Sequence, residues 1–230
     1  MSDAFCPFRR EYQMDVLEGF LRKDINGMTG QKILDACCGQ GRLLYYLYQF
    51  DSKQFYTGFD YVPEFVGDTE ELFKGNDSVR CVVADIYNLP ASMQKAFDIS
   101  ILYKTLAWIP NCAEVLQALF SVTRKKLYIT TPLYAGDIDF EIQAHVHSEV
   151  NISGSVVRSH HIYGIPRFVE LCIELGAEAV KIHDMNLPFP LPEPDDLNVL
   201  QTYTIETSQK RYIEMTNIIK LDWKLVEIEL

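Results

Sequence analysis

Two glycines and an acidic residue are spaced so that they could hold a small ligand at the end of a strand. The segment ILDACCGQG, residues 33–41, ends an apolar run and leads into a helical pattern. Backbone amides at a helix start and the positive end of the helix dipole attract polar ligands, and Gly39 and Gly41 allow a close approach. Dinucleotides and S-adenosylmethionine are the two cofactor classes that use this geometry.

Residue 44 helps to separate these two classes. The dinucleotide fingerprint G-x-G-x-x-G has a third glycine for close helix–strand packing, and this sequence has Leu44 at that position. Asp35 at the strand end would crowd a pyrophosphate but suits a ligand with an ammonium and a sulfonium group. The pattern therefore favours S-adenosylmethionine, and a nicotinamide-dependent oxidoreductase is the alternative.

Two further acids follow at equal spacing. Asp35, Asp60 and Asp85 are 25 residues apart, about one βα unit, which predicts all three at the carboxyl edge of a parallel sheet. At that edge, the carboxylate of Asp60 could accept hydrogen bonds from both ribose hydroxyls. Each acid alone is equally typical of a helix N-cap or a solvated turn. The three acids together with the glycine loop favour a cofactor site.

The segment LDACCGQGR resembles motif I of the class I S-adenosylmethionine-dependent methyltransferases, with Cys37 where many members have a third glycine. The resemblance covers residues 30–130. It implies S-adenosylmethionine as cofactor, S-adenosylhomocysteine as product, a contact of Asp85 with the adenine amino group, and Ile86 near the ring. The expected cofactor-binding residues are Asp35, Cys37, Gly39, Gly41, Asp60, Tyr61, Asp85, Ile86 and Tyr103.

Four of the five histidines lie in one polar stretch, residues 134–163. Methyl transfer to a hydroxyl needs an aligned nucleophile and a base for its proton, and histidine is the side chain best matched to that work near neutral pH. The catalytic candidates are His145, His147, His160, His161 and Tyr103. Surface histidines, core histidines and a metal pair are the alternatives, but no carboxylate cluster accompanies the histidines, so we expect no metal.

Three residues are expected to contact the acceptor. Trp108, after the fourth predicted strand, is similar to a position that lines the cofactor or substrate in methyltransferases. Arg9 and Tyr12 could close over the active site and hold an anionic acceptor. The C-terminal sequence is faintly similar to bacterial small-molecule methyltransferases linked to surface-polysaccharide decoration, which favours a sugar or a sugar-linked phosphate.

Charge and motifs narrow the acceptor class. The net charge of -11 argues against a nucleic-acid partner, and the sequence lacks the [DN]-P-P-[FY] motif of amino-directed nucleic-acid methyltransferases. Methylation of an oxygen of a small polar acceptor is the leading hypothesis. An N-methyltransferase and a non-catalytic S-adenosylmethionine-binding partner subunit are the alternatives.

Alternating strand and helix patterns must position these residues. The strands are predicted at 32–38, 55–60, 79–85, 97–103, 126–132, 177–185 and 200–207, and the helices at 11–23, 42–50, 64–73, 113–123 and 165–176. This alternation indicates an α/β fold. With the family resemblance, we expect a Rossmann-like, mostly parallel seven-stranded sheet with helices on both faces, a lid-like insertion after the fifth strand and a C-terminal β extension.

The length favours one domain over residues 1–230, with an N-terminal helical cap at 1–30, a lid or hairpin at 134–163 and an extension at 208–230. The six cysteines form no C-x-x-C pair, which is typical of free thiols in a reducing cytosol. We find no signal-peptide pattern and no apolar run of about 20 residues. We expect a soluble cytoplasmic protein, in a homodimer, with no membrane partner.

Overall fold

The computed structural model describes residues 8, 10–146, 156–193, 202–216 and 219–230, without the side chains of 144–146 and 156–158. The chain forms two compact units. The first consists of Met1–Tyr103, Gln117–Tyr128 and Leu230, and the second of Lys104–Leu116 and Ile129–Glu229. The expectation of a single domain over the whole chain stays a prediction.

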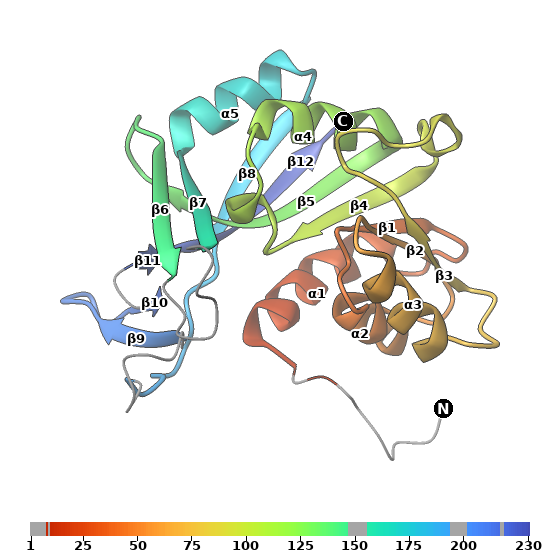
Figure 1. Ribbon diagram of the computed structural model, residues 1–230, viewed down its shortest axis with the longest axis horizontal. Coiled ribbons are helices and arrows are strands. Elements are labelled where there is room, and N and C mark those ends of the chain that lie inside the picture. Colours follow the sequence, from red (N-terminus) through yellow and green to blue (C-terminus); the bar gives the residue numbers. More distant parts are fainter. Residues whose placement is uncertain (1–7, 9, 147–155, 194–201, 217–218) are drawn as a thin grey trace. The chain divides into compact units, whose positions relative to one another are not determined.

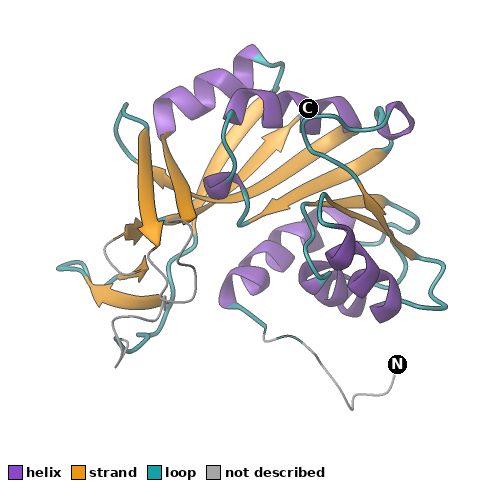
Figure 2. Cartoon of the chain, viewed as in Figure 1, coloured by secondary structure: helices purple, strands orange, loops and turns teal. Residues whose placement is uncertain are grey.

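The described residues contain five α-helices (Figures 1 and 2). They are α1 (Tyr12–Ile25), α2 (Arg42–Phe50), α3 (Pro63–Leu72), α4 (Cys112–Val122) and α5 (Ile165–Glu174). Each helix lies within two residues of a predicted one, and α2 has the predicted bounds. The match follows from apolar side chains at helical spacing, such as Met14, Leu17 and Leu21 of α1, which are all buried.

In the first unit, four parallel strands position the predicted acids. They are β1 (Lys32–Ala36), β2 (Phe55–Asp60), β3 (Val79–Val83) and β4 (Phe97–Tyr103). Their order is β3-β2-β1-β4, followed by the first residues of β5 (Thr123–Tyr134). Buried positions follow one another without alternation along β1, β2 and β4, as expected for parallel strands covered on both faces. In Figure 1, α1, α2 and α3 lie together on one side of these strands.

In the second unit, the rest of β5 is followed by β12 (Trp223–Glu229) and β8 (Ala179–Asp184), which pair antiparallel to each other. The predicted insertion contains its own hairpin, β6 (Phe140–Val146) and β7 (Val156–Gly164), and β7 also pairs parallel to β5. Helix α5 contacts β7 and β8. The strand orders of the two units together contain seven strands, which confirms the predicted Rossmann-like fold.

One strand differs from its predicted place. Residues 200–207 were expected to close the main sheet, but β9 (Thr202–Glu206) pairs with β10 (Tyr212–Thr216), which pairs with β11 (Ile219–Leu221), in a separate antiparallel sheet. Strand β12 lies beside β8 instead. The reason is burial: six of the seven β12 residues are buried, whereas the β9 residues are half-buried or exposed.

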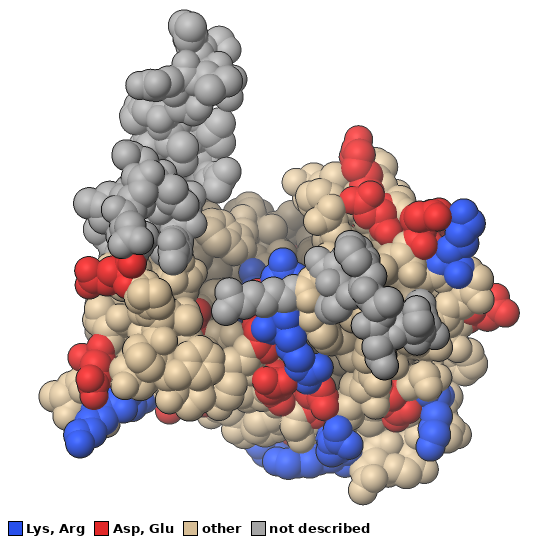
Figure 3. Space-filling model, turned by 90° about the horizontal axis from the view of Figure 1, so that it is seen from below, with Lys and Arg blue, Asp and Glu red and all other residues tan. Residues whose placement is uncertain are grey.

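Within the described ranges, the structure shows no helix with both the length and the apolar character needed to span a membrane. On the face drawn in Figure 3, basic side chains are interspersed with acidic ones rather than gathered into a continuous basic area.

Candidate functional site

The loop between β1 and α2 turns sharply because three of its residues have left-handed backbone conformations. Cys37 has φ 56°, Gly39 has φ 53° and Gly41 has φ 78°. A left-handed conformation is unusual for a residue with a Cβ such as Cys37 and ordinary for glycine. The loop is tied to the end of β2, since the N–H of Cys38 donates a 2.9 Å hydrogen bond to the carbonyl of Phe59.

The two loop glycines have different surroundings. A Cβ added to Gly39 would meet no atom within 4 Å, so the space beside Gly39 is open to a ligand. A Cβ added to Gly41 would lie 2.8 Å from Cγ2 of Thr69 in α3. Thr69 also donates a 3.2 Å hydrogen bond to the carbonyl of Gly39. Gly41 therefore allows α3 to approach the loop, and Gly39 leaves room for the ligand.

Asp60 links the loop to the end of β2. Its Oδ2 accepts a 2.9 Å hydrogen bond from the N–H of Gly39, and its Oδ1 accepts a 3.0 Å hydrogen bond from the N–H of Val62. Only 6% of Asp60 is exposed. A carboxylate oxygen has more than one lone-pair direction, so these bonds leave acceptor capacity for a hydroxyl of a ligand. The ribose contact of Asp60 stays a prediction.

Asp35 lies deeper than a ligand-facing acid would. It is 1% exposed, and burial raises the pKa of this carboxyl well above its usual value, with Cys81 and Asp60 adding to the rise. One hydrogen bond from the backbone of Leu44 opposes the rise, and Oδ2 has no hydrogen-bond partner among the described residues. The structure therefore places Asp35 beneath the loop, and its predicted contact with the cofactor is untested.

The third acid lies at the same edge as Asp60. Val83, the last residue of β3, is beside Asp60 in the register, and Asp85 follows two residues later. Asp85 is exposed, and its Oδ1 accepts a 3.0 Å hydrogen bond from the N–H of Tyr87. The next side chain, Ile86, is buried. The contacts of Asp85 with the adenine amino group and of Ile86 with the ring stay predictions.

The pKa of the Cys37 thiol shows that the three acids lie close to it. Burial raises its pKa to about 12, and Asp60, Asp35 and Asp85 all contribute to that rise. The thiol therefore stays neutral at physiological pH. The three acids lie within or just after neighbouring parallel strands, and all three are near the thiol of Cys37. Tyr61, another predicted contact, is 73% exposed next to Asp60.

Tyr103, at the end of β4, belongs to a hydrogen-bond network with two residues that the sequence did not point to. Its hydroxyl donates a 3.0 Å hydrogen bond to Oε2 of Glu11, which precedes α1. Oε1 of Glu11 accepts a 2.7 Å bond from Arg42, the first residue of α2. Glu11 and Tyr103 are 92 residues apart, so no local pattern could reveal this network. Tyr12 is half-buried at the first position of α1.

In the second unit, Trp108 meets one of the predicted histidines. The ring centroids of Trp108 and His160 are 4.6 Å apart in an edge-on arrangement. His160 is 3% exposed, neither of its ring nitrogens has a hydrogen-bond partner among the described residues, and burial lowers the pKa of the imidazole, with His161 adding to the effect. His161 stacks on Tyr163 at 6.2 Å.

The remaining predicted residues cannot be placed in the site. Arg9 and His147 lie outside the described residues, and so does the side chain of His145, which belongs to β6.

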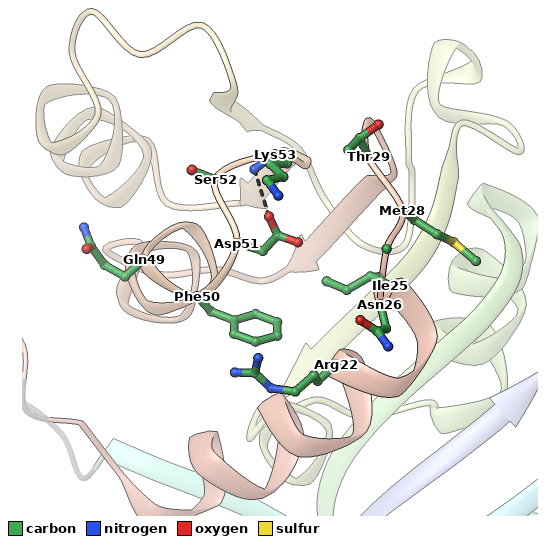
Figure 4. Close-up of a pocket in the computed structure, with 11 residues that line it drawn as sticks. Arg22, Ile25, Asn26, Met28, Thr29, Gln49, Phe50, Asp51, Ser52 and Lys53 are labelled. Carbon is green, nitrogen blue, oxygen red and sulfur yellow. Dashed lines mark hydrogen bonds between the residues drawn. The ribbon is translucent and has the colours of Figure 1, made fainter.

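A cavity of about 390 Å³ in the first unit lies away from these acids (Figure 4). It is lined by the ends of α1 and α2 and by residues that precede β1 and β2. In Figure 4 the guanidinium of Arg22 lies against the ring of Phe50, 4.5 Å from its centroid. This cavity is at the amino-terminal ends of the strands, whereas ligands of open α/β sheets bind at the carboxyl ends. We therefore place the candidate site at the loop and the three acids.

The groups at that edge fit S-adenosylmethionine. The open space at Gly39 would admit the ligand, and Asp60 and Asp85 offer acceptors for hydroxyl and amino groups. Close helix–strand packing is achieved without a third loop glycine, because Gly58 of β2 lies against Leu44: a Cβ on Gly58 would be 2.6 Å from Cδ1 of Leu44. The buried Leu44 thus occupies the position where a dinucleotide fold has its third glycine.

Comparisons with known proteins agree with this reading. A family described as a methyltransferase domain matches residues 28–178. No curated protein matches the chain.

Solved structures share the fold at low sequence identity. Magnesium protoporphyrin IX methyltransferase from Synechocystis PCC 6803 with bound SAM has 14% identity, with a TM-score of 0.56 over 94% of this chain and 77% of that chain. The N-terminal domain of EvdMO1, in the presence of SAH and D-fucose, has 13% identity and a TM-score of 0.63, covering 96% and 84%. The [4+2]-cyclase SpnF has 17% identity and a TM-score of 0.56, covering 75% and 61%. At such identities the likeness concerns the fold alone.

Proposed function

The chain belongs to the methyltransferase domain family, whose cofactor is S-adenosylmethionine, and on this premise we propose that it methylates a hydroxyl oxygen of a small polar acceptor. The observation that carries the choice of oxygen is His160. A buried imidazole with both nitrogens unpartnered among the described residues is available to take a proton from a bound hydroxyl. Buried polar groups are nearly always hydrogen-bonded, so an unpartnered one suggests a missing ligand.

The proposal assigns the cofactor to the first unit. The backbone of Gly39 and the carboxylates of Asp60 and Asp85 would hold it, with Ile86 and Tyr61 beside its ring. When bound, the cofactor supplies a methyl group made electrophilic by the sulfonium. The chain itself must then hold the acceptor in line and remove its proton, because an alcohol oxygen is a weak nucleophile while protonated.

The histidine that removes this proton is proposed to be His160. Its lowered pKa keeps the ring neutral near pH 7, which is the form that accepts a proton. Trp108, which lies against His160, follows Tyr103 by five residues in the chain. The proposal gives Trp108 the role of an acceptor-lining residue. His161, His145 and His147 remain the alternative bases.

A sugar or a sugar-linked phosphate is the acceptor class that we propose to test first. The N-terminal domain of EvdMO1, whose fold is similar, was crystallised in the presence of SAH and D-fucose. Half of the Trp108 surface is exposed, which offers a ring face to such a molecule. Arg9 and Tyr12 are proposed to hold an anionic group of the acceptor. We also propose that the protein works in the cytoplasm, as a homodimer and without a nucleic-acid partner.

Calorimetric titration tests the cofactor site. We expect micromolar affinity for S-adenosylmethionine and S-adenosylhomocysteine, no comparable affinity for NADH, and a loss of about tenfold or more in Asp60→Ala, equivalent to about 1.4 kcal/mol. The matched control is Asp77→Ala, an exposed acid at the opposite, amino-terminal end of β3. Binding of NADH alone would overturn the assignment.

The choice of oxygen is tested by an acceptor screen that measures S-adenosylhomocysteine release with sugars, other alcohols and amines. We expect turnover with a hydroxyl acceptor and a decrease in kcat of about 100-fold or more in His160→Gln. Turnover of an amine with His160→Gln near wild type would instead indicate N-methylation. Cofactor affinity with no product from any class would indicate a non-catalytic partner subunit.

A further inference from the structure

Two buried thiols meet under the glycine loop. Sγ of Cys38 lies 3.4 Å from Sγ of Cys81, and both cysteines are free. Cys38 belongs to the loop that follows β1, whereas Cys81 lies in β3. Strand β2 runs between β1 and β3, so the two side chains must meet across it.

Gly58 of β2 provides the space for this contact. In the register, Gly58 lies directly beside Cys81, and a Cβ on Gly58 would be 2.8 Å from Sγ of Cys38. A side chain at this position would collide with Cys38 and displace it from Cys81. The missing side chain of Gly58 therefore permits the thiol pair.

The two thiols have complementary acid–base character. The hydrogen bond with Cys38 lowers the pKa of Cys81, and a side-chain contact with Thr69 acts in the same direction. The hydrogen bond with Cys81 and burial raise the pKa of Cys38. The contact between the two sulfurs therefore acts in opposite directions on the two pKa values. Two sulfurs in contact are the arrangement in which one sulfur reacts with an oxidant and the other resolves the product.

We propose that Cys38 and Cys81 form a site of reversible oxidation, closed to a disulfide by a small peroxide, that controls the glycine loop. The sulfur of Cys81 attacks one peroxide oxygen, the O–O bond breaks, and the departing hydroxide takes a proton to give water. The sulfur of Cys38 then attacks the resulting sulfenic acid and loses its proton to the departing hydroxide. Overall, two thiols and one hydrogen peroxide give one disulfide and two waters.

The disulfide would act on the loop because the sulfurs must come closer. A disulfide bond is about 2.05 Å long, so the atoms must approach by more than 1 Å from their present 3.4 Å. Cys38 is adjacent to Gly39, whose N–H is bonded to Asp60. Pulling Cys38 towards β3 displaces that N–H from Asp60. This consequence rests on the proposed function of the loop as the cofactor site.

The test measures the cross-link and the cofactor affinity separately. Purified reduced protein is treated with one equivalent of hydrogen peroxide, remaining thiols are alkylated, and peptides are mapped by mass spectrometry. S-adenosylmethionine is then titrated into reduced, oxidised and dithiothreitol-treated protein. We expect a Cys38–Cys81 peptide, a loss of affinity of at least tenfold, and recovery on reduction.

Two variants serve as controls. Cys81→Ser is expected to bind the cofactor like the reduced wild type and to keep that affinity after peroxide treatment. Cys172→Ser, which removes a buried thiol of the second unit, is expected to respond to peroxide like the wild type.

The outcomes separate the two claims. If peroxide oxidises other cysteines and no Cys38–Cys81 peptide forms, or if the peptide forms and affinity is unchanged, the inference is wrong. If reduced wild-type protein does not bind S-adenosylmethionine, the cofactor assignment fails, whatever the peptide map shows.

Discussion

The hydroxyl of Tyr103 donates a hydrogen bond to Oε2 of Glu11, and the other oxygen of this carboxylate accepts a bond from Arg42. The end of β4, the entry to α1 and the start of α2 are therefore joined by one carboxylate. Since Arg42 follows the glycine loop directly, the network fixes the N-terminal segment to the helix that begins the proposed cofactor site. Tyr103 acts through Glu11 as a positioning residue in this arrangement.

Tyr103→Phe removes the hydrogen bond to Glu11 and keeps the ring. We expect faster amide hydrogen exchange in the first turn of α1, corresponding to a loss of about 0.5–1.5 kcal/mol of local stability. Tyr48→Phe is the matched control, because it removes a tyrosine hydroxyl from α2, where the half-buried ring lies against Phe73. Equal exchange in the two variants would show that the Tyr103 hydroxyl does not hold α1.

Gly39→Ala and Gly41→Ala separate backbone strain from collision. Both residues have positive φ, so both substitutions introduce strain of about 1–2 kcal/mol. Only the Gly41 variant also places a Cβ against Thr69. We expect Gly41→Ala to lower the free energy of unfolding more than Gly39→Ala, and Thr69→Ala to recover part of the difference in the double variant. Urea unfolding measures the free energy of unfolding of the wild type, the two glycine variants and the double variant Gly41→Ala/Thr69→Ala. A smaller effect at Gly41 would contradict the collision.

Gly58→Ala tests the contact between β2 and α2. The added methyl group would meet Leu44 and Cys38, and overpacking of this kind costs about 1–3 kcal/mol. The control is Gly67→Ala in α3, where the new Cβ meets nothing within 4 Å. There we expect a gain of about 0.5–1 kcal/mol from the higher helix propensity of alanine. A neutral Gly58→Ala would show that α2 can move away at little cost.

His160 gives the stability of the fold a pH dependence. Its pKa in the folded protein is below the unfolded value of about 6.5, so the unfolded chain binds the proton more readily. Above about pH 6.5, His160 does not change the free energy of unfolding. As the pH falls from about 6.5 towards the lower pKa of the folded state, the free energy of unfolding decreases. Urea unfolding at pH 7.5 and 5.5 should show a smaller decrease in His160→Gln than in the wild type.

His161→Gln controls for the loss of an imidazole from the same strand. The difference in pH response between His160→Gln and His161→Gln is the effect assigned to His160. If the decrease between the two pH values is the same in His160→Gln and the wild type, the buried ring is already protonated in the folded protein or contributes nothing.

Local patterns predicted most of the first unit. Helix α2 and strand β4 have their predicted bounds, because their apolar periodicity and flanking residues are contained in the segment itself. Asp60 and Asp85 lie at one edge because parallel strands of similar length repeat the same offset. The glycine loop was identified from the residues of the segment 33–41 themselves.

The features that the sequence did not predict depend on tertiary contacts. The position of β12 beside β8 depends on burial that β9 does not achieve, and both segments have strand-like patterns. The depth of Asp35, the use of Gly58 in place of a third loop glycine and the bond between Glu11 and Tyr103 all depend on residues distant in sequence. Such contacts leave no local signal.

The first unit is assembled from three separate stretches of chain, and this arrangement has a consequence for biosynthesis. Lys126 contacts Asp24 across 102 residues, and the N–H of Leu230 donates to the carbonyl of Lys125. The unit that carries the proposed cofactor site cannot close until residues 117–128 and Leu230 have been synthesised. A high proportion of such distant contacts slows folding and leaves strand edges exposed for longer. The nascent chain should therefore depend on chaperones more than a fold with local contacts would.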